Sequence, residues 1–362
     1  MMLRLNLYQR YLIREVFASI ALVLLAFLVV FSFFNLIDEL RNIGRDGYTL
    51  GYALLYVTLG IPGLVYELIP IAALIGCLYA LSTLARHSEI TVLRASGLAT
   101  HELLATLCRA AALLAVVAFL VGELLVPASE RLAQEMKARA MSKVIAQSGF
   151  KSGLWLKDGR SFINIRTALP DAQLHGVRIY KFVEGNVLES VTEAARATFV
   201  SSGEWRLEEV VRTTLQDTQS SVDAHDVLVW QSAVTPELLS VLMVAPERMS
   251  LYGLWNYHQH LSENRQKTDR YEIALWKKLI YPLASLVMVT LALPFGYSHD
   301  RVGGVSLKIF TGVMLGIAFY MLNGLFSNLG VINAWPPFAS AITPSAAFML
   351  LAVGMLWWAE RR

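Results

Sequence analysis

The stretch Gly153-Leu-Trp-Leu-Lys-Asp-Gly-Arg-Ser-Phe-Ile-Asn-Ile-Arg166 has the pattern of a β-hairpin, in a chain that is otherwise strongly apolar. Two strand-like runs flank Asp158-Gly159, a dipeptide that favours a tight turn because glycine tolerates positive φ. Two more turn sequences follow at 184–186 and 201–203, with short strand-like runs around them. This pattern is typical of an antiparallel sandwich or jelly roll. We therefore predict an all-β jelly-roll domain within residues 128–270.

The composition of the whole chain is that of a membrane protein. Apolar residues make up 56% of the 362 residues and charged residues only 16%, whereas a soluble protein carries about 25% charged residues. About 20 apolar residues suffice to cross the hydrocarbon core of a membrane. The sequence predicts an α-helical membrane protein with six transmembrane helices, three on each side of the inserted β domain. The expected spans lie at 16–37, 64–85, 101–126, 273–295, 305–326 and 338–358.

Several local signals set the expected ends of these helices. The first apolar run is longer than a signal-peptide core of about 7–15 residues, so we expect an uncleaved span. Pro62 and Pro70 predict an interfacial piece before a second span that begins near Leu64. Pro127 is expected to end the third span. Helical spacing in Ser250–Leu261 predicts an amphipathic helix that lies at the membrane surface.

Basic residues in the short loops predict the orientation of the chain in the membrane. One side carries Arg4, Arg10, Arg14, Arg86, Arg94, Arg301, Lys308, Arg361 and Arg362. The opposite short loops carry only Arg41 and Arg45. We expect both termini in the cytosol and the β domain outside it. The expected domains are 1–127 with spans one to three, 128–270 with the β domain and the amphipathic helix, and 271–362 with spans four to six.

The sequence argues against an enzyme. It contains no Gly-Lys-Ser or Gly-Lys-Thr, so no P-loop can hold ATP phosphates. His101-Glu-Leu-Leu-Ala105 has alanine where a zinc protease has its second histidine ligand. Cys77 and Cys108 lie within predicted spans and are expected to be small buried residues. A net charge of +3 is too small to argue for nucleic acid. We expect no catalytic site, no metal and no cofactor.

Basic residues near the outer ends of the spans run against the usual charge bias. These residues are Arg41, Arg131, Lys137, Arg139, Lys277 and Lys278. One interpretation is that they hold an anionic lipid headgroup, because lysine and arginine bind phosphates well. The other is that they extend to the phosphates of ordinary phospholipids. The residues alone leave both open.

The segment Arg86–Gly97, between spans two and three on the cytosolic side, also has two interpretations. Ser88 is expected to cap a short helix that begins at Glu89 and ends at Gly97, with Ile90 and Leu93 on one face. The helix is either a simple connection or a docking element for a soluble ATPase subunit. A transporter without an ATP site needs a partner that has one.

A set of short motifs along the chain carries a resemblance to a known family. They are Asp38-Glu-Leu40, Pro70-Ile-Ala-Ala-Leu-Ile-Gly76, Ser88-Glu-Ile-Thr-Val-Leu-Arg-Ala-Ser-Gly97, Gly122-Glu123, Gly153-Leu-Trp155 and Leu251-Tyr-Gly-Leu254. With these motifs the chain resembles, nearly end to end, the LptF/LptG family of lipopolysaccharide-export permeases. The strand Gly153-Leu-Trp155 is more similar to the LptG branch of the family.

The resemblance implies a particular assembly. It implies six spans, a periplasmic jelly roll, and pairing with an LptF-type permease above a cytosolic dimer of an LptB-type ATPase. An LptC-type protein is implied as a further periplasmic and membrane partner. The segment 86–97 becomes the coupling helix, with ATPase-coupling residues Arg86, Ser88, Glu89, Ile90, Leu93 and Arg94.

The resemblance also implies a lipid site. Spans one and five are expected to line the lipid cavity, with Arg41 and Lys137 turned toward the lipid. Leu325 and Phe326, near the outer end of span five, are expected to supply part of its apolar wall. Some LptG proteins carry lysine at the position of Asn35, and an asparagine cannot pair with a phosphate.

We therefore expect a non-catalytic permease subunit in the inner membrane of a Gram-negative bacterium. It is expected to extract lipopolysaccharide from that membrane and pass it to a periplasmic bridge. One alternative is a mechanotransmission subunit that conveys the motion of an ATPase to a periplasmic partner without carrying substrate. A membrane-anchored scaffold without a motor is the other. Three spans on either side of the β domain favour the permease.

Overall fold

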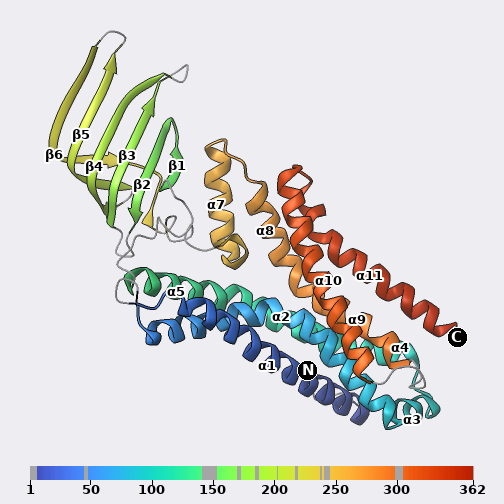
Figure 1. Ribbon diagram of the computed structural model, residues 1–362. Helices are drawn as coiled ribbons and strands as arrows, with labels where there is room; N and C mark the ends of the chain where they lie inside the picture. Colours follow the sequence, from blue (N-terminus) through green and yellow to red (C-terminus); the bar gives the residue numbers. More distant parts are fainter. Residues whose placement is uncertain are drawn as a thin grey trace.

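The structure is a computed structural model, shown as a ribbon in Figure 1. It describes residues 6–44, 48–140, 153–168, 173–183, 187–201, 203–216, 219–236, 239, 245–297 and 305–361. The turn expected at 184–186 and part of the turn at 201–203 lie outside these residues.

The described helices confirm the six expected spans. Six helical segments are long and apolar enough to cross a membrane: Leu7–Leu40, Leu50–Arg86, His101–Lys137, Asp269–Phe295, Ser306–Ile332 and Pro337–Trp358. The helices that build them are α1 (Leu7–Leu40), α2 (Leu50–Arg86), α4 (Thr100–Leu120), α5 (Val126–Ala140), α8 (Asp269–Ile280), α9 (Ala284–Tyr297), α10 (Val305–Ile332) and α11 (Pro337–Glu360). The fourth span is bent at the 3₁₀ turn η5 (Tyr281–Leu283), which contains a proline.

Helix α2 lies at the centre of the bundle, in contact with α1, α5, α9 and α10. The interfacial piece expected before Leu64 is not a separate element, because α2 is one helix of 37 residues that runs through both Pro62 and Pro70. Neighbouring helices can compensate for the hydrogen bond that a proline removes within a membrane span. Gly76 allows α1 to approach closely, because a Cβ there would lie 2.6 Å from the Cα atom of Ile20.

The third span also differs from the expectation. Pro127 does not end it, and the helix continues to Ala140 as α5. Between α4 and α5 the chain makes the π-helical turn η2 (Val121–Leu125). A proline clashes with the carbonyl of the fourth residue before it, and a wider π turn at that point relieves the clash. The prediction was wrong because the sequence gives no signal for the π turn. The helix therefore extends 14 residues beyond the expected end at Val126, and the last 13 of them lie in the range assigned to the β domain.

The polar block contains an antiparallel sheet, as expected. Its strands are β1 (Leu154–Asp158), β2 (Ser161–Ala168), β3 (Gln173–Phe182), β4 (Leu188–Ser201), β5 (Glu204–Gln216) and β6 (Gln219–Gln231). The turn at Asp158-Gly159 is confirmed, with Gly159 at φ +57° and Leu156 opposite Ile163. Trp205 is fully buried on one face and donates its indole N–H to the Val234 carbonyl at 2.8 Å.

The connectivity of the described strands is simpler than that of a jelly roll. All six form one sheet in the order β1-β2-β3-β4-β5-β6. Each strand pairs with its neighbour in sequence, because the connections are too short to cross over another strand. The inserted all-β domain is confirmed, and its described strands form a meander instead of two Greek keys.

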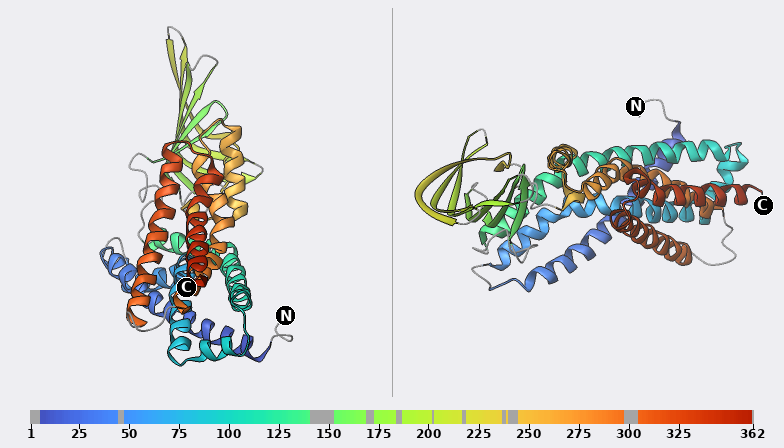
Figure 2. Two further views of the ribbon diagram at one scale, coloured as in Figure 1. Left: turned by 90° about the vertical axis from the view of Figure 1, so that its right-hand side faces the viewer. Right: turned by 90° about the horizontal axis from the view of Figure 1, so that it is seen from above.

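The sheet projects from one end of the helical bundle (Figures 1 and 2). The beginning of α1, the short helix α3 (Glu89–Ala95) and the end of α11 all lie at the opposite end. Helix α7 (Leu251–Glu263) packs against α8 as a hairpin next to the sheet. Its apolar residues Leu254, Tyr257 and Leu261 are buried, so the amphipathic pattern is used for packing on protein. The Gly159 amide donates to Asn264 Oδ1 at 2.8 Å and ties the first hairpin to the end of α7.

Candidate functional site

The segment expected to dock an ATPase forms α3, at the end of the bundle farthest from the sheet (Figure 1). Glu89 lies in its first turn. Gly97 has φ +96°, and the Leu98 amide donates to the Leu93 carbonyl at 3.1 Å, which is the closure expected at a helix end. Ser88 has φ 63°, whereas an N-cap residue is normally extended, so Ser88 differs from the cap that we expected.

The residues predicted to contact an ATPase divide into inner and outer ones. Ile90 is only 6% exposed and belongs to the core that holds the spans together. Arg86 and Ser88 are exposed, and Glu89 and Leu93 are half-buried. The side chain of Arg94 lies outside the described part of the chain. A partner at this end would therefore meet the exposed residues of α3 while Ile90 anchors the helix.

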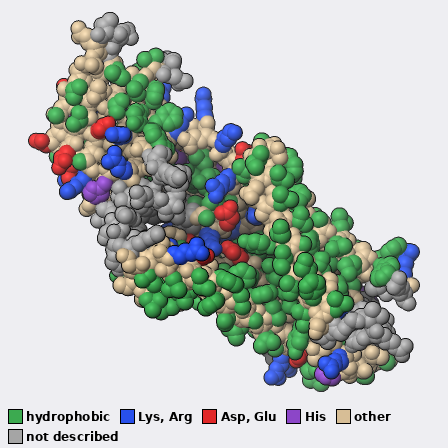
Figure 3. Space-filling model, viewed as in Figure 1, with side chains coloured by type: hydrophobic (Ala, Val, Ile, Leu, Met, Phe, Trp, Pro, Cys, Tyr) green, Lys and Arg blue, Asp and Glu red, His purple; other side chains and the backbone are tan. Residues whose placement is uncertain are grey.

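Charged residues of both signs gather in the hollow where the sheet meets the helices (Figure 3). Below it, the visible surface of the bundle is almost wholly hydrophobic. At this junction the chain returns from the β domain through the 3₁₀ turn η4 (Pro246–Arg248). We call the ion pairs around Arg248, Lys278 and Lys137 the junction cluster.

Arg248 is the centre of the first part of the junction cluster. Its Nη1 atom lies 2.9 Å from Glu130 Oε2, and its Nη2 atom lies 3.3 Å from Glu67 Oε1. Burial by itself lowers the pKa of this guanidinium, but the two carboxylates more than offset it and the net pKa is raised. The arginine stays charged and links α2, α5 and the return connection.

Lys278 is the centre of the second part. It is 4% exposed, its ammonium donates to the Met249 carbonyl, and it lies 3.5 Å from Glu123 Oε2. Both oxygens of Glu123 accept the Leu251 amide at 3.0 Å, at the start of α7. An acidic group at a helix N-terminus is favoured by the free amides there. Lys278 and Glu123 therefore join α8, the π turn and α7.

Lys137 is the centre of the third part. Its ammonium lies 2.8 Å from Glu39 Oε1 and 4.4 Å from the ring centre of Tyr56. The Tyr48 hydroxyl donates to the same Glu39 oxygen at 2.7 Å. Burial raises the pKa of Tyr48, and the hydrogen bond to Glu39 raises it further. Lys137 is thus engaged inside the protein, together with Lys278, although both were expected to face a lipid.

The other predicted cations are placed differently. Arg41 is exposed at the end of α1, where its only ion pair among the described residues is a 3.8 Å contact with Asp38. Arg131 is exposed on α5. Arg139 lies on the same helix, but its side chain is outside the described part of the structure. Of these three cations, Arg41 and Arg131 have exposed side chains that remain open to a ligand.

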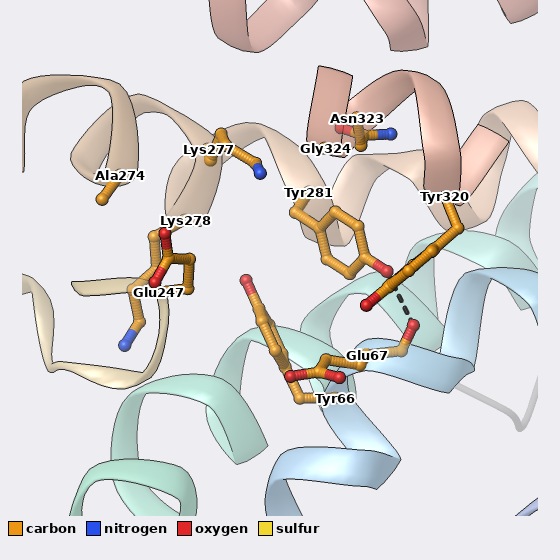
Figure 4. Close-up of a pocket in the computed structure, with 10 residues that line it drawn as sticks. All are labelled: Tyr66, Glu67, Glu247, Ala274, Lys277, Lys278, Tyr281, Tyr320, Asn323 and Gly324. Carbon is orange, nitrogen blue, oxygen red and sulfur yellow. Dashed lines mark hydrogen bonds between the residues drawn. The ribbon is translucent and has the colours of Figure 1, made fainter. Parts of the chain in front are cut away.

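Lys277 lines a cavity of about 200 Å³ between α2, α8, α10 and η4 (Figure 4). The other lining residues are Tyr66, Glu67, Glu247, Ala274, Lys278, Tyr281, Tyr320, Asn323 and Gly324. Leu325, one of the two predicted wall residues, is 50% exposed on α10. Phe326 is half-buried, and its ring centre lies 6.1 Å from that of Trp335.

Sequence reasoning missed the acidic half of the junction cluster. No role was predicted for Glu39, Glu67, Glu130 or Arg248. A signal was present, because Glu123 and Glu130 are seven residues apart and share one face of a helix. Ionisable residues inside spans are costly, so each predicts a partner. Among the described residues, no group of three or more histidine, cysteine, aspartate or glutamate side chains could hold a metal ion.

Comparison with known proteins covers nearly the whole chain. A family model described as lipopolysaccharide export system permease LptF/LptG matches residues 10–358. The chain is 32% identical over 349 residues to the lipopolysaccharide export system permease protein LptG of Escherichia coli K12, with 96% of this chain and 97% of the relative covered. It is 28% identical to LptG of Haemophilus influenzae, with 98% of each covered. Its identity to Escherichia coli K12 LptF is 23%, with 96% of this chain and 94% of the relative covered.

Proposed function

The chain belongs to the lipopolysaccharide export permease family LptF/LptG, and we propose which of its surfaces bind the lipid, the second permease and the ATPase. The chain is a permease subunit of lipopolysaccharide export and is not itself catalytic. In our proposal it extracts lipopolysaccharide from the inner membrane and passes it to a periplasmic bridge. It pairs with an LptF-type permease above an LptB-type ATPase dimer, and an LptC-type protein is the further partner.

One observation carries this proposal: two helices that flank α2 expose long apolar stripes. In its most apolar window, α1 is 17% buried, and the span of α10 is 22% buried. The exposed residues on α1 include Leu22, Leu25, Val29 and Phe33, and those on α10 include Phe310, Met314, Ile317, Met321 and Leu325. Each set follows the three- and four-residue spacing of one helix face. These faces suit a second permease and the acyl chains of a lipid.

The phosphates of the lipid would meet Arg41 and Arg131. Both side chains are exposed at the end of the bundle next to the sheet, so they lie above the apolar stripes. Charge-assisted contacts of arginine with phosphate are strong and often bidentate. Lys137 and Lys278 have internal partners, so in our proposal they hold the site in place instead of binding the lipid.

Helix α3 would transmit the motion of the ATPase. It lies at the same end as the beginning of α1 and the end of α11, and this arrangement supports a cytosolic location for all three. The sheet at the opposite end would then lie in the periplasm. A cysteine at Ser201 on β4 should react with a membrane-impermeant thiol reagent in spheroplasts, while a cysteine at Ser96 should not. The reverse labelling pattern would contradict this orientation.

The experiment that tests the function is ATP-driven release of lipopolysaccharide from the reconstituted complex. We expect the double change Arg41→Glu and Arg131→Glu to lower lipid copurification and release, since each charge-assisted contact is worth about 1.5–3 kcal/mol. ATP hydrolysis should persist, because α3 is unchanged. Arg206→Glu, an exposed arginine on β5, is the matched control and should behave as the unsubstituted protein.

The same measurement separates the permease from the mechanotransmission alternative. A subunit that only conveys motion would hold no lipid, and the double charge reversal would leave lipid occupancy unchanged. For the coupling role, Glu89→Lys should reduce copurification with the ATPase or uncouple hydrolysis from release. Losing one partner of an interface charge pair costs about 2–5 kcal/mol. If both readouts are unchanged, α3 is only a connection.

A further inference from the structure

We propose that the cavity between α2, α8, α10 and η4 binds a zwitterionic phosphodiester headgroup, in which a phosphate is joined to a primary ammonium by a short linker. The proposal rests on the proposed function, since it requires a lipid at the outer ends of the spans. It adds a second, smaller lipid site and a chemical preference that an anion site alone would not have.

Two unpaired charges of opposite sign line this cavity. Lys277 lies on α8 and Glu247 lies on η4; neither is within ion-pair distance of another described residue, although Glu247 and Glu67 attract Lys277 at longer range. The ammonium of Lys277 points into the cavity from one side, and the hydroxyls of Tyr66 and Tyr320 point into it from others (Figure 4). A cation and a carboxylate that line one cavity without direct ion-pair contact fit a guest that carries both charges.

The remaining charged groups of the cavity are already engaged. Glu67 pairs with Arg248 at 3.3 Å, and its carbonyl accepts the Tyr281 hydroxyl at 2.6 Å. Lys278 points away from the cavity and donates to the Met249 carbonyl. Lys277 and Glu247 are therefore the charges that a guest would neutralise, and together they sum to zero.

This charge balance selects among headgroups. A simple phosphate could bind Lys277 and the tyrosine hydroxyls, but it would place a negative charge in a cavity that also holds the Glu247 carboxylate. An ethanolamine-like ammonium can donate N–H hydrogen bonds to the Glu247 carboxylate, whereas a choline-like ammonium has no N–H group to donate. A glycerol headgroup carries no positive charge. The ethanolamine headgroup has a phosphate for Lys277 and an ammonium for Glu247, so it matches both charges of the cavity.

The size and access of the cavity agree with a headgroup. Its volume of about 200 Å³ is below the roughly 300–1,000 Å³ of pockets for drug-sized ligands, so it cannot hold a whole multi-acyl lipid. Tyr320 is 57% exposed, and a Cβ added at Gly324 would meet no atom within 4 Å. The acyl chains of a guest could thus stay outside, against the exposed stripe of α10.

Two lipids could supply this chemistry: an ethanolamine phospholipid, or a lipopolysaccharide whose phosphate bears ethanolamine. The test uses the full complex in nanodiscs, with a photoreactive diazirine amino acid in place of Gly324. The same probe at Gly354 on α11, which also has no neighbouring atom within 4 Å, measures background capture. One arm compares phosphatidylethanolamine, phosphatidylcholine and phosphatidylglycerol nanodiscs. The other adds lipopolysaccharide with or without phosphate-linked ethanolamine to phosphatidylglycerol nanodiscs.

We expect capture of the ethanolamine lipid to exceed that of the glycerol lipid by about tenfold in at least one arm, since one charge-assisted hydrogen bond distinguishes them. Glu247→Gln should abolish this preference, and Lys277→Gln should lower capture of both lipids. Glu263→Gln and Lys267→Gln, exposed nearby charges outside the cavity, should change neither. The arm that shows the preference identifies the source of the headgroup.

Equal capture of the ethanolamine and glycerol lipids in both arms would overturn the proposal. So would a preference that survives Glu247→Gln. Release of lipopolysaccharide is measured on the same preparations. Intact release without headgroup preference rejects the cavity site and leaves the permease function standing, whereas a failure of the unsubstituted complex to release lipopolysaccharide rejects the function itself. An unchanged elution profile and thermal unfolding midpoint of each variant complex show that the variant is folded.

Discussion

Helix α2 and the pair α1 and α10 are all apolar enough to span a membrane, yet they are used in opposite ways. The most apolar window of α2 has a mean hydropathy of 2.1 and is 78% buried inside the protein. That of α1 has a higher mean hydropathy, 2.9, and is only 17% buried. Hydropathy thus locates the spans without saying which of them hold the fold. The buried helix holds this chain together, whereas the exposed ones are, in our proposal, the surfaces for lipid and the partner permease.

The largest expected effect tests the closest helix contact of α2. Gly76→Val should lower the free energy of unfolding by about 3 kcal/mol or more, because its Cβ would lie against the backbone of Ile20. Gly60→Val, on the same helix, would meet no atom within 4 Å and should be nearly neutral. SDS titration of the purified protein measures both. If both variants lose the same free energy of unfolding, the close contact at Gly76 is not what stabilises the helix pair.

A smaller effect is expected where the polar end of α2 meets the junction cluster. Arg248→Met leaves Glu67 and Glu130 without their partner. Because Arg248 and Glu67 are each about one-third exposed, we expect a loss of about 2 kcal/mol, less than for a fully buried pair. Adding Glu67→Gln and Glu130→Gln should recover much of it. A triple variant no more stable than Arg248→Met would show that packing of the arginine matters more than its charge.

The next effect concerns the contact between the end of α1 and the loop before α2. Tyr48→Phe removes the donor to Glu39 and should cost about 1 kcal/mol. Tyr252→Phe, at a residue 75% exposed on α7, is the control and should leave unfolding unchanged. If thermal unfolding of Tyr48→Phe matches that of the unsubstituted protein, the Glu39 site does not depend on this hydrogen bond.

The smallest expected change in stability lies on the exposed stripe of α10. Met321→Ala together with Leu325→Ala should change the free energy of unfolding of the isolated chain by less than about 0.5 kcal/mol, since both side chains are at least half exposed. Copurification with the second permease or with lipid should fall. If the double variant is much less stable but still assembles normally, these residues stabilise the fold, as α2 does, and are not a binding surface.

The sequence was sufficient for features that depend on local pattern. The six spans follow from hydropathy, the turn at Asp158-Gly159 from glycine at positive φ, and the end of α3 from Gly97. It was insufficient where distant residues decide the outcome. Lys137 meets Glu39 across 98 positions, and Arg248 meets Glu130 across 118, so neither pairing has a local signal. The isolated cations therefore looked free for a ligand.

The two errors about proline have a related physical origin. Pro62, Pro70 and Pro127 were each expected to interrupt a helix, and all three lie within continuous helical segments. In water an interrupted helix can bind solvent, but within a membrane the backbone must satisfy itself. Helical structure therefore persists through prolines, and the strain is taken up by adjustments such as the π turn before Pro127.

That π turn also sets the rotation of α5 about its own axis relative to α4. Each residue in an α-helix turns the chain by about 100°, so the wider turn at Val121–Leu125 sets the angle at which α5 leaves α4. A π turn holds one residue more than an α turn over nearly the same rotation, so it is a deletion in the regular helix between Val126 and Glu130 that would rotate Glu130 and Lys137 together by about 100°, away from Arg248 and Glu39. A single-codon deletion, conservative in composition, would then break two parts of the junction cluster, because Glu130 and Lys137 are seven residues apart and lie on one face of α5. In this segment a change of length therefore disturbs more contacts of the junction cluster than a single substitution does.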